Sequence, residues 1–108
     1  MKKIVCMSLL FLMISPALGF YAYGQGYTIT RLTNNDYVDG SPNINNHGQV
    51  VWSGFDGHDY EIFLYDGTNI IQLTDNERND RRPHINDNGQ IVWESEIGNN
   101  EIFIANPN

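Results

Sequence analysis

Residues 39–74 read DGSPNINNHGQVVWSGFDGHDYEIFLYDGTNIIQLT, and residues 80–106 read DRRPHINDNGQIVWESEIGNNEIFIAN. The second stretch repeats the first at an offset of 41 residues, which falls to 40 after a one-residue gap at Tyr60. The clearest matches are Asp39/Asp80, Pro42/Pro83, Ile44-Asn45/Ile85-Asn86, Gly48-Gln49/Gly89-Gln90, Val51-Trp52/Val92-Trp93 and Glu61-Ile62-Phe63/Glu101-Ile102-Phe103, and upstream Leu32-Thr33 matches Leu73-Thr74. A repeat of this period indicates one supersecondary unit per copy.

Each repeat unit is predicted to form short strands. Turn residues stand at 46–48, 56–57, 66–67 and 87–89, where Asn, Asp and Gly tolerate the backbone of tight turns. Between them, strands are expected at residues 42–45, 49–54, 60–66 and 70–74, and no helical periodicity appears after residue 25. In the third strand Ile62 and Leu64 alternate with Phe63 and Tyr65, so both faces are apolar. Such a sheet needs a neighbour on each side, which predicts an all-β fold of packed four-stranded sheets.

The pattern Asp39-x-x-Pro42-x-Ile44-Asn45-x-x-Gly48 comes first in this unit, and Val50-x-Trp52, residues 61–67 and residues 72–74 follow it. It resembles the TolB-type β-propeller repeat. The resemblance covers residues 29–106 and implies two four-stranded antiparallel β-propeller blades, a partial propeller. Ile44 and Ile85 stand where that repeat usually has Trp, and the α/β domain that precedes the propeller in TolB is absent. The resemblance therefore predicts a fold more strongly than a function.

The two units, about 31–71 and 72–108, contain an incomplete set of strands. Residues 27–33 match a fourth strand without a preceding unit, and the second unit stops after its third strand. We predict that residues 27–33 complete the blade formed by residues 83–105, within one chain or between copies, because unpaired strand edges attract partners. Two open apolar faces indicate self-association as a possible homo-oligomer of three or four copies, or a truncated member of a larger propeller family.

The N-terminus has the layout of a secretory signal peptide. Lys2 and Lys3 precede an apolar run over residues 4–14, and small residues follow. The run is too short for a bilayer-spanning helix, so no stable membrane anchor is expected. Cleavage is predicted after Gly24, with Gly19 as the alternative, which gives a signal peptide at 1–24 and an exported chain, periplasmic or extracellular, at 25–108. Cys6 is the chain's one cysteine, so the exported part would contain no disulfide.

Charge excludes some classes of partner. The formal net charge is −7, and removal of Lys2 and Lys3 with the signal peptide makes it −9. Nucleic acid and anionic lipid are poor partners for such a chain, because binding either requires clustered cations. The exception is a cluster of Arg78, Arg81 and Arg82 in the segment linking the two units, which is the candidate binding site. Its alternative is a solvated loop paired with acidic residues of the same segment.

Other side chains indicate structure more than chemistry. Trp52 and Trp93 occupy the same repeat position and are interpreted as core residues, with sugar stacking as the alternative. His47, His58 and His84 occupy three different repeat positions, and we expect them in surface turns and not as metal ligands. Residues 56–59 and 87–89 resemble fragments of calcium loops but also suit tight turns. We expect no catalytic residues, no metal and no cofactor.

These observations predict an exported, non-catalytic β-propeller-repeat module for protein or ligand binding or scaffolding. The alternative is a fragment or subunit of a propeller-containing exported enzyme, such as a polysaccharide lyase or a peptidase. Repeat-breaking residues gathered in one shared cavity would favour the enzyme, and a uniform rim would favour binding.

Overall fold

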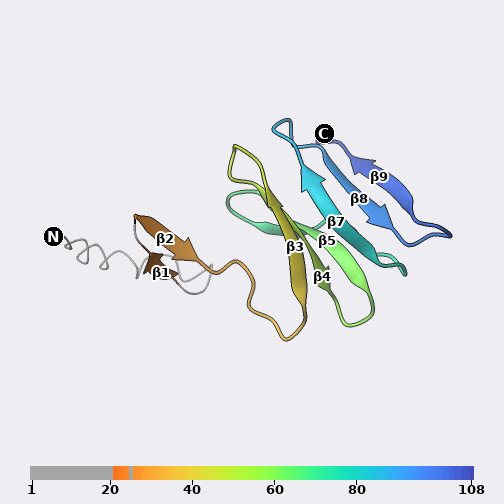
Figure 1. Ribbon diagram of the computed structural model, residues 1–108, viewed down its shortest axis with the longest axis horizontal. Helices are drawn as coiled ribbons and strands as arrows, with labels where there is room; N and C mark the ends of the chain where they lie inside the picture. The colour runs from red at the N-terminus through yellow and green to blue at the C-terminus, as the bar shows by residue number, and fades with distance from the viewer. Residues whose placement is uncertain (1–20, 25) are drawn as a thin grey trace. The chain divides into compact units, whose positions relative to one another are not determined.

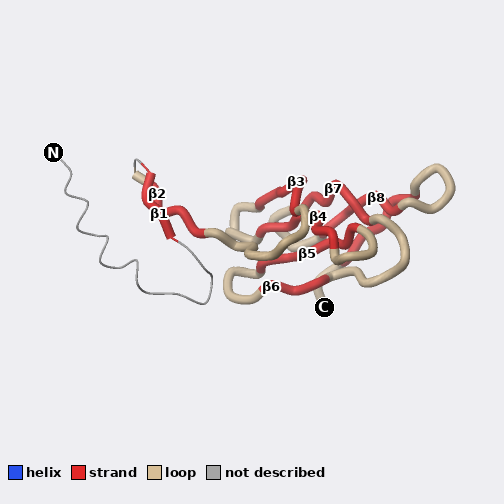
Figure 2. Tube along the Cα trace, turned by 90° about the horizontal axis from the view of Figure 1, so that it is seen from below, coloured by secondary structure: helices blue, strands red, loops and turns tan. Residues whose placement is uncertain are grey.

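The computed structural model describes residues 21–24 and 26–108, so most of the predicted signal peptide lies outside the described residues. The chain divides into two compact units, residues 1–36 and residues 37–108. The strands are β1 (Tyr21–Gly24), β2 (Tyr27–Thr30), β3 (Asp39–Ile44), β4 (Val50–Phe55), β5 (Tyr60–Tyr65), β6 (Ile70–Gln72), β7 (Asp80–Ile85), β8 (Ile91–Ser95) and β9 (Glu101–Ala105) (Figure 1). The all-β prediction is confirmed for the described residues, none of which is helical (Figure 2). Accordingly, no described helix is a candidate membrane span.

The first unit contains a β-hairpin. β1 pairs antiparallel with β2, with Tyr21 opposite Thr30 and Gly24 opposite Tyr27. The strand predicted at residues 27–33 therefore ends at Thr30. Within the chain its partner is β1 and not β9, so the intramolecular form of the strand-completion prediction is not found; pairing between copies remains a prediction.

In the second unit, β3 to β6 form a four-stranded antiparallel sheet in the order β3-β4-β5-β6, called sheet 1. These are the four strands expected for the first repeat, with boundaries shifted by up to three residues. The turn prediction is also confirmed, since Gly48 has a φ of 77° and Gly57 one of 105°. Asn45 stabilises the first turn, because its Oδ1 accepts hydrogen bonds from the backbone amides of His47 and Gln49 at 3.0 Å.

The second repeat forms a three-stranded antiparallel sheet in the order β7-β8-β9, called sheet 2. It has no fourth strand, as the sequence predicted. Both sheets contain the same irregularity in their first strand: the register shifts between Gly40 and Asn43 in β3 and between Arg81 and His84 in β7. Ser41 and Arg82 lie inside these bulges with φ of 52° and 55°. Because this uncommon backbone conformation occurs at the same position in both sequence repeats, the two repeats share local geometry as well as sequence.

Sheet 2 packs on one face of sheet 1, with β7 against β3, β4 and β5 (Figure 1). The core between the sheets comprises Val51, Ile62, Ile85 and Ile91, and the partly buried Leu64, Leu73, Trp93 and Ala105 pack against it. Polar contacts surround the apolar centre: Arg82 N donates to Ser53 Oγ at 3.3 Å, and Ile85 N donates to Asn43 Oδ1 at 3.1 Å. Burial of these apolar side chains stabilises the unit by removing their surface from water.

The two tryptophans stack on phenylalanines at equivalent positions. Trp52 and Phe63 have ring centroids 5.8 Å apart, and Trp93 and Phe103 have centroids 5.9 Å apart, both nearly parallel. The strand register places each pair directly opposite across neighbouring strands. Trp52 is 5% exposed and Trp93 is partly buried, so the core prediction is confirmed for the first and in part for the second.

Candidate functional site

The main functional feature is a pair of sheet faces that the interface between the two sheets leaves uncovered. Equivalent residues differ sharply in burial: Ile62 is 0% exposed and Ile102 is 71% exposed, while Ile85 is 8% exposed and Ile44 is 64% exposed. The difference follows from packing, because Ile62 and Ile85 face the neighbouring sheet. Equivalent positions of the other sheet have no such neighbour among the strands of residues 37–108.

Each open face has a defined set of residues. The strand registers place alternate side chains on the same side of a sheet. The sheet-1 open face consists of Ile44, Val50, Trp52, Phe63 and Tyr65, of which Ile44 is exposed, Trp52 is buried against Phe63 and the other three are partly buried. The sheet-2 open face consists of His84, Val92, Glu94, Ile102 and Ile104. Exposed apolar surface that extends over neighbouring strands is typical of an interaction site.

The structure places the predicted arginine cluster partly differently from expectation. Only Arg78 lies in the linking segment, whereas Arg81 and Arg82 belong to β7. Arg81 Nη1 is 2.7 Å from Glu96 Oε2 and its guanidinium lies over the Tyr60 ring, 4.7 Å from the centroid. Arg82 Nη1 is 2.7 Å from Glu94 Oε1.

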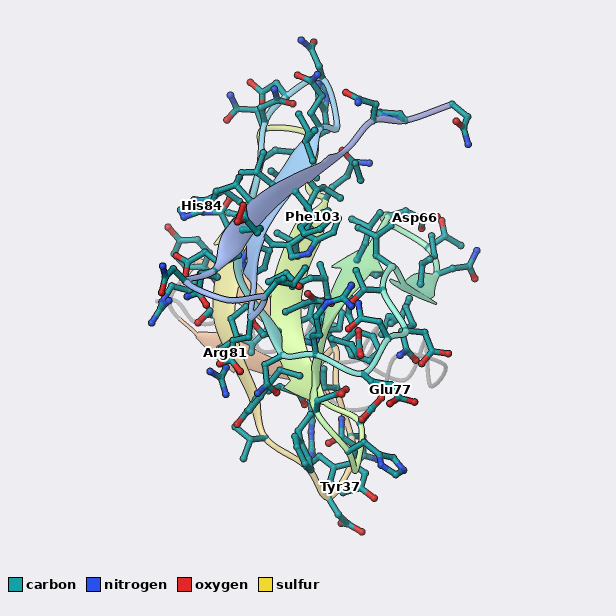
Figure 3. All side chains as sticks on the ribbon, turned by 90° about the vertical axis from the view of Figure 1, so that its right-hand side faces the viewer. Tyr37, Asp66, Glu77, Arg81, His84 and Phe103 are labelled. Atoms are coloured by element: carbon teal, nitrogen blue, oxygen red, sulfur yellow. The ribbon has the colours of Figure 1, made fainter. Side chains whose placement is uncertain are left out.

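The alternative interpretation of the cluster, a solvated loop paired with acidic residues of the same segment, is therefore corrected for Arg81 and Arg82. Both partners follow β7 in the chain: Glu94 lies in β8, and Glu96 comes directly after it. Viewed from β9, Arg81 and His84 lie on one side of the unit and Glu77 on the other (Figure 3). The three arginines remain a predicted binding site, but two of the three cations already have an anionic partner.

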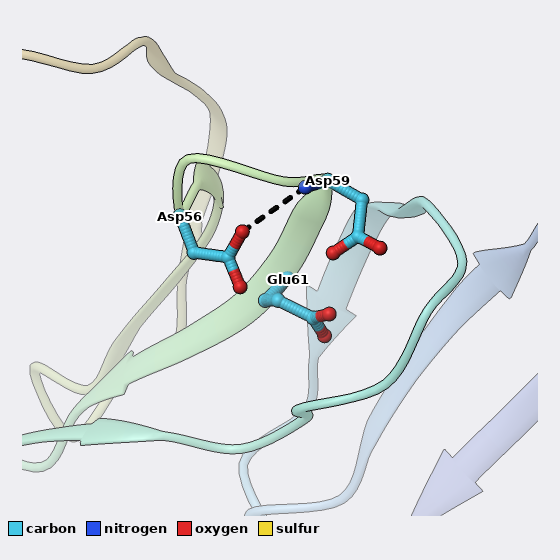
Figure 4. Close-up of side chains that lie close together, drawn as sticks. All are labelled: Asp56, Asp59 and Glu61. Atoms are coloured by element: carbon cyan, nitrogen blue, oxygen red, sulfur yellow. Dashed lines mark hydrogen bonds between the residues drawn. The ribbon is translucent and has the colours of Figure 1, made fainter.

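A second cluster, which the sequence reasoning did not bring together, contains three carboxylates at the start of β5. One oxygen from each of Asp56, Asp59 and Glu61 lies within 4.8 Å of the others (Figure 4). The hairpin between β4 and β5 causes this proximity, since Asp56 Oδ1 accepts hydrogen bonds from the amides of His58 and Asp59. Such a cluster can hold a divalent cation or share a proton.

Glu61 is the unusual member, because its side chain is 0% exposed. Its Oε2 accepts a hydrogen bond from Thr74 Oγ1 at 2.5 Å, and its Oε1 accepts one from Asn76 N at 3.0 Å. Burial raises the pKa of Glu61 to about 7; these two hydrogen bonds oppose the rise, while Asp59 and Asp80 add to it. Backbone amides instead lower the pKa of Asp56. At pH 6 the arrangement therefore favours a protonated Glu61 beside an ionised Asp56.

This difference predicts a pH-dependent stability. Below the ordinary value of 4.5, Glu61 is protonated in both the folded and the unfolded chain, so its contribution to stability is fully present. As pH rises through about 7, that contribution is lost, because only the unfolded chain ionises freely. We expect the free energy of unfolding to fall by about 1 to 3 kcal/mol from this group between pH 5 and pH 8. Urea unfolding at several pH values measures it, and Glu61→Gln should flatten the slope.

Glu101→Gln is the matched control, because Glu101 occupies the equivalent position but is exposed. It should leave the slope unchanged. At pH 6, where Glu61 keeps its proton, calcium or EDTA should not move the unfolding midpoint. A slope that survives Glu61→Gln, or a rise in stability with calcium, would contradict this account.

The remaining predictions concern single residues. His47, His58 and His84 are all exposed, but His84 lies in β7 and not in a turn, which corrects that expectation. Glu61 and Glu101 occupy equivalent positions of the two repeats, and this recurrence indicated the same structural role in both. Only Glu61 is buried, because sheet 2 has no segment equivalent to Thr74 and Asn76 beside Glu101.

No protein-family model, curated protein or solved structure matches this chain. The two repeat sheets, their open faces and the carboxylate cluster are therefore the observations from which a function can be argued.

Proposed function

We propose that this chain is an exported, non-catalytic module of the TolB-type β-propeller-repeat class that binds or scaffolds a protein or ligand. Its two sheets act as adjacent blades, and its open faces provide the binding surface. The observation that carries the proposal is that sheet 2 packs on one face of sheet 1. The opposite face of each sheet has no neighbouring sheet among residues 37–108 and contains an exposed isoleucine, Ile44 on sheet 1 and Ile102 on sheet 2.

Several features of the second unit support the blade interpretation. Sheet 1 is an antiparallel meander of four strands, and the next strand after its edge strand β6 is β7, an edge strand of sheet 2. Propeller blades are four-stranded sheets arranged around an axis and packed face to face. The second sheet stacks on the first through Ile85, Ile91 and Trp93, whose equivalents Ile44, Val50 and Trp52 belong to the sheet-1 open face.

Export is the first testable part of the proposal. The order of Lys2-Lys3, an apolar run and small residues at the start of the chain favours a cleaved signal peptide. Mass spectrometry of the protein recovered from the envelope or medium of an exporting host should find an N-terminus at Gln25, or at Phe20 for the alternative site. An intact Met1 on the recovered protein would overturn the export proposal.

Binding through the open faces is the second part. Pull-down with the exported chain, compared with an Ile102→Lys variant that changes the sheet-2 open face, should show whether bound partners depend on that face. Arg78→Ala tests the arginine cluster with the same readout. Partners that neither variant loses would contradict the proposed surfaces.

A further inference from the structure

We propose that a second copy of this chain binds head to tail, its sheet-1 open face packing on the sheet-2 open face of the first copy. This inference rests on the proposed function and names the partner of its open faces. The contact would reproduce between copies the packing that already exists between the two sheets of one copy.

The residues of the internal interface recur on the open faces. The sheet-2 side of that interface includes Ile85, Trp93 and, stacked on Trp93, Phe103. The sheet-1 open face contains the same three residue types at the equivalent positions, Ile44, Trp52 and Phe63. Ile44 is 64% exposed, Phe63 is partly buried and Trp52 is 5% exposed, so Ile44 is the member that a second copy can reach directly.

The receiving surface is repeated as well. The covered face of sheet 1 contains Val51, Ile62 and Leu64. At the equivalent positions the sheet-2 open face contains Val92, Ile102 and Ile104, of which the two isoleucines are 71% and 54% exposed. The apolar centre of the interface between the two sheets therefore has a counterpart on sheet 2, with aliphatic side chains of similar size.

The polar contacts at this interface can also be repeated. Within the chain the amide of Arg82, inside its bulge, donates to Ser53 Oγ. The equivalent amide belongs to Ser41, inside the equivalent bulge, and the equivalent acceptor is Glu94. A carboxylate accepts a backbone N–H more strongly than a hydroxyl does, so this substitution preserves the contact.

The N-terminal segment fits the same arrangement. In sheet 1, β6 pairs with β5 and Thr74 then donates to Glu61. Thr33 is the equivalent of Thr74, and Glu101 is the exposed equivalent of Glu61. We include in the proposed contact the pairing of the second copy's residues 29–33 with the edge of β9, which would match its Thr33 with Glu101. In this structure β2 pairs with β1, whose residues the proposed signal cleavage removes.

A contact of this kind is heterologous, so it closes into a ring or extends as a filament. Propellers close with about four to eight blades. Because each copy supplies two sheets, three or four copies give rings of six or eight blades, and these are the closed assemblies we expect. Light scattering coupled to size exclusion and native mass spectrometry of the chain recovered from an exporting host give the mass directly.

Two single substitutions test the geometry. Ile44→Lys changes the sheet-1 open face and Ile102→Lys changes the sheet-2 open face; both side chains are largely exposed, so each variant should keep the circular dichroism spectrum of the folded chain. Each alone should be monomeric. Mixed together, they should form a dimer of one copy of each, because one intact face of each type remains. Ile97→Lys, in the turn between β8 and β9, is the matched control and should assemble like the unchanged chain.

Cross-linking tests the strand register. In sheet 1, Leu64 of β5 lies directly opposite Ile71 of β6. By the repeat, the equivalent pair between two copies is Ile104 of one copy and Thr30 of the other. In a Cys6→Ser background, a chain carrying Thr30→Cys and Ile104→Cys should give a ladder of disulfide-linked copies on a non-reducing gel. Thr28→Cys with Ile104→Cys, two residues out of register, should give much less.

An unchanged chain that is exported, folded and monomeric would overturn the head-to-tail contact and leave the proposed export and binding function standing. A dimer that survives Ile44→Lys but not Ile102→Lys would also overturn it, because that result indicates a symmetric contact between two sheet-2 faces. A chain that keeps Met1 after recovery refutes the export proposal whatever its mass.

Discussion

Trp52→Ala should lower the free energy of unfolding by about 3 to 5 kcal/mol, the range for truncation of a large buried aromatic side chain. Trp52 is 5% exposed, and its ring lies flat against Phe63 at a centroid distance of 5.8 Å. The substitution removes both the buried apolar surface and the stacking contact. Urea unfolding followed by circular dichroism at a protein concentration that keeps the chain monomeric measures the loss.

Trp93→Ala is the natural comparison, because Trp93 stacks on Phe103 in the same way but is only partly buried. Its cost should be smaller than that of Trp52→Ala. Equal costs would show that the burial difference between the two positions is not retained in solution. Trp52→Phe, which keeps an aromatic ring opposite Phe63, should recover part of the loss.

The sequence predicted most of the local structure, because turn chemistry and alternation act over a few residues. Asn45 and Gly48 define the first hairpin in the sequence and adopt that turn in the structure. The same holds for Asp56 and Gly57, where the Asp56 carboxylate accepts backbone amides and Gly57 supplies the positive φ. The number and order of the strands in both sequence repeats, β3 to β6 and β7 to β9, followed from these turn residues and from the alternation between them.

The sequence could not predict which copy of a repeated residue is buried. Ile62 and Ile102 are identical in type and in neighbours, yet their exposures differ by most of the possible range. The difference arises from sheet packing, which is non-local. For the same reason the sequence offered, as the alternative to a binding site, arginines paired within their own segment, whereas Arg81 pairs with Glu96 and Arg82 with Glu94.

The carboxylate cluster shows a similar limit. Asp56, Asp59 and Glu61 are close in the sequence, and residues 56–59 already resembled a fragment of a calcium loop, but Glu61 was not included in it. What makes Glu61 unusual is its burial beneath Thr74 and Asn76, which the chain brings back only after β6. The raised pKa of Glu61 depends on its burial by the segment after β6, and no pattern within residues 56–61 predicts that burial.

The repeat also provides a direct test of burial energetics, in which one substitution is made at two equivalent positions. Ile62→Ala should lower the free energy of unfolding by about 2 to 5 kcal/mol, because Ile62 is 0% exposed at the centre of the interface between the sheets and its truncation leaves a cavity. Ile102→Ala in the monomeric chain should change it by less than about 0.5 kcal/mol, as for most surface substitutions. Urea unfolding of both variants at low protein concentration measures the pair.

At higher protein concentration the same two variants distinguish the stability that comes from folding of one chain from the stability that comes from assembly. If copies bind head to tail, Ile102 becomes the intermolecular counterpart of Ile62, and the cost of Ile102→Ala should grow with concentration because association stabilises the folded chain by mass action. The cost of Ile62→Ala should not grow in this way, since its packing is complete within one copy. A cost at Ile102 that is large and independent of concentration would show that this face is already covered inside the monomer, and the open-face interpretation would then be wrong.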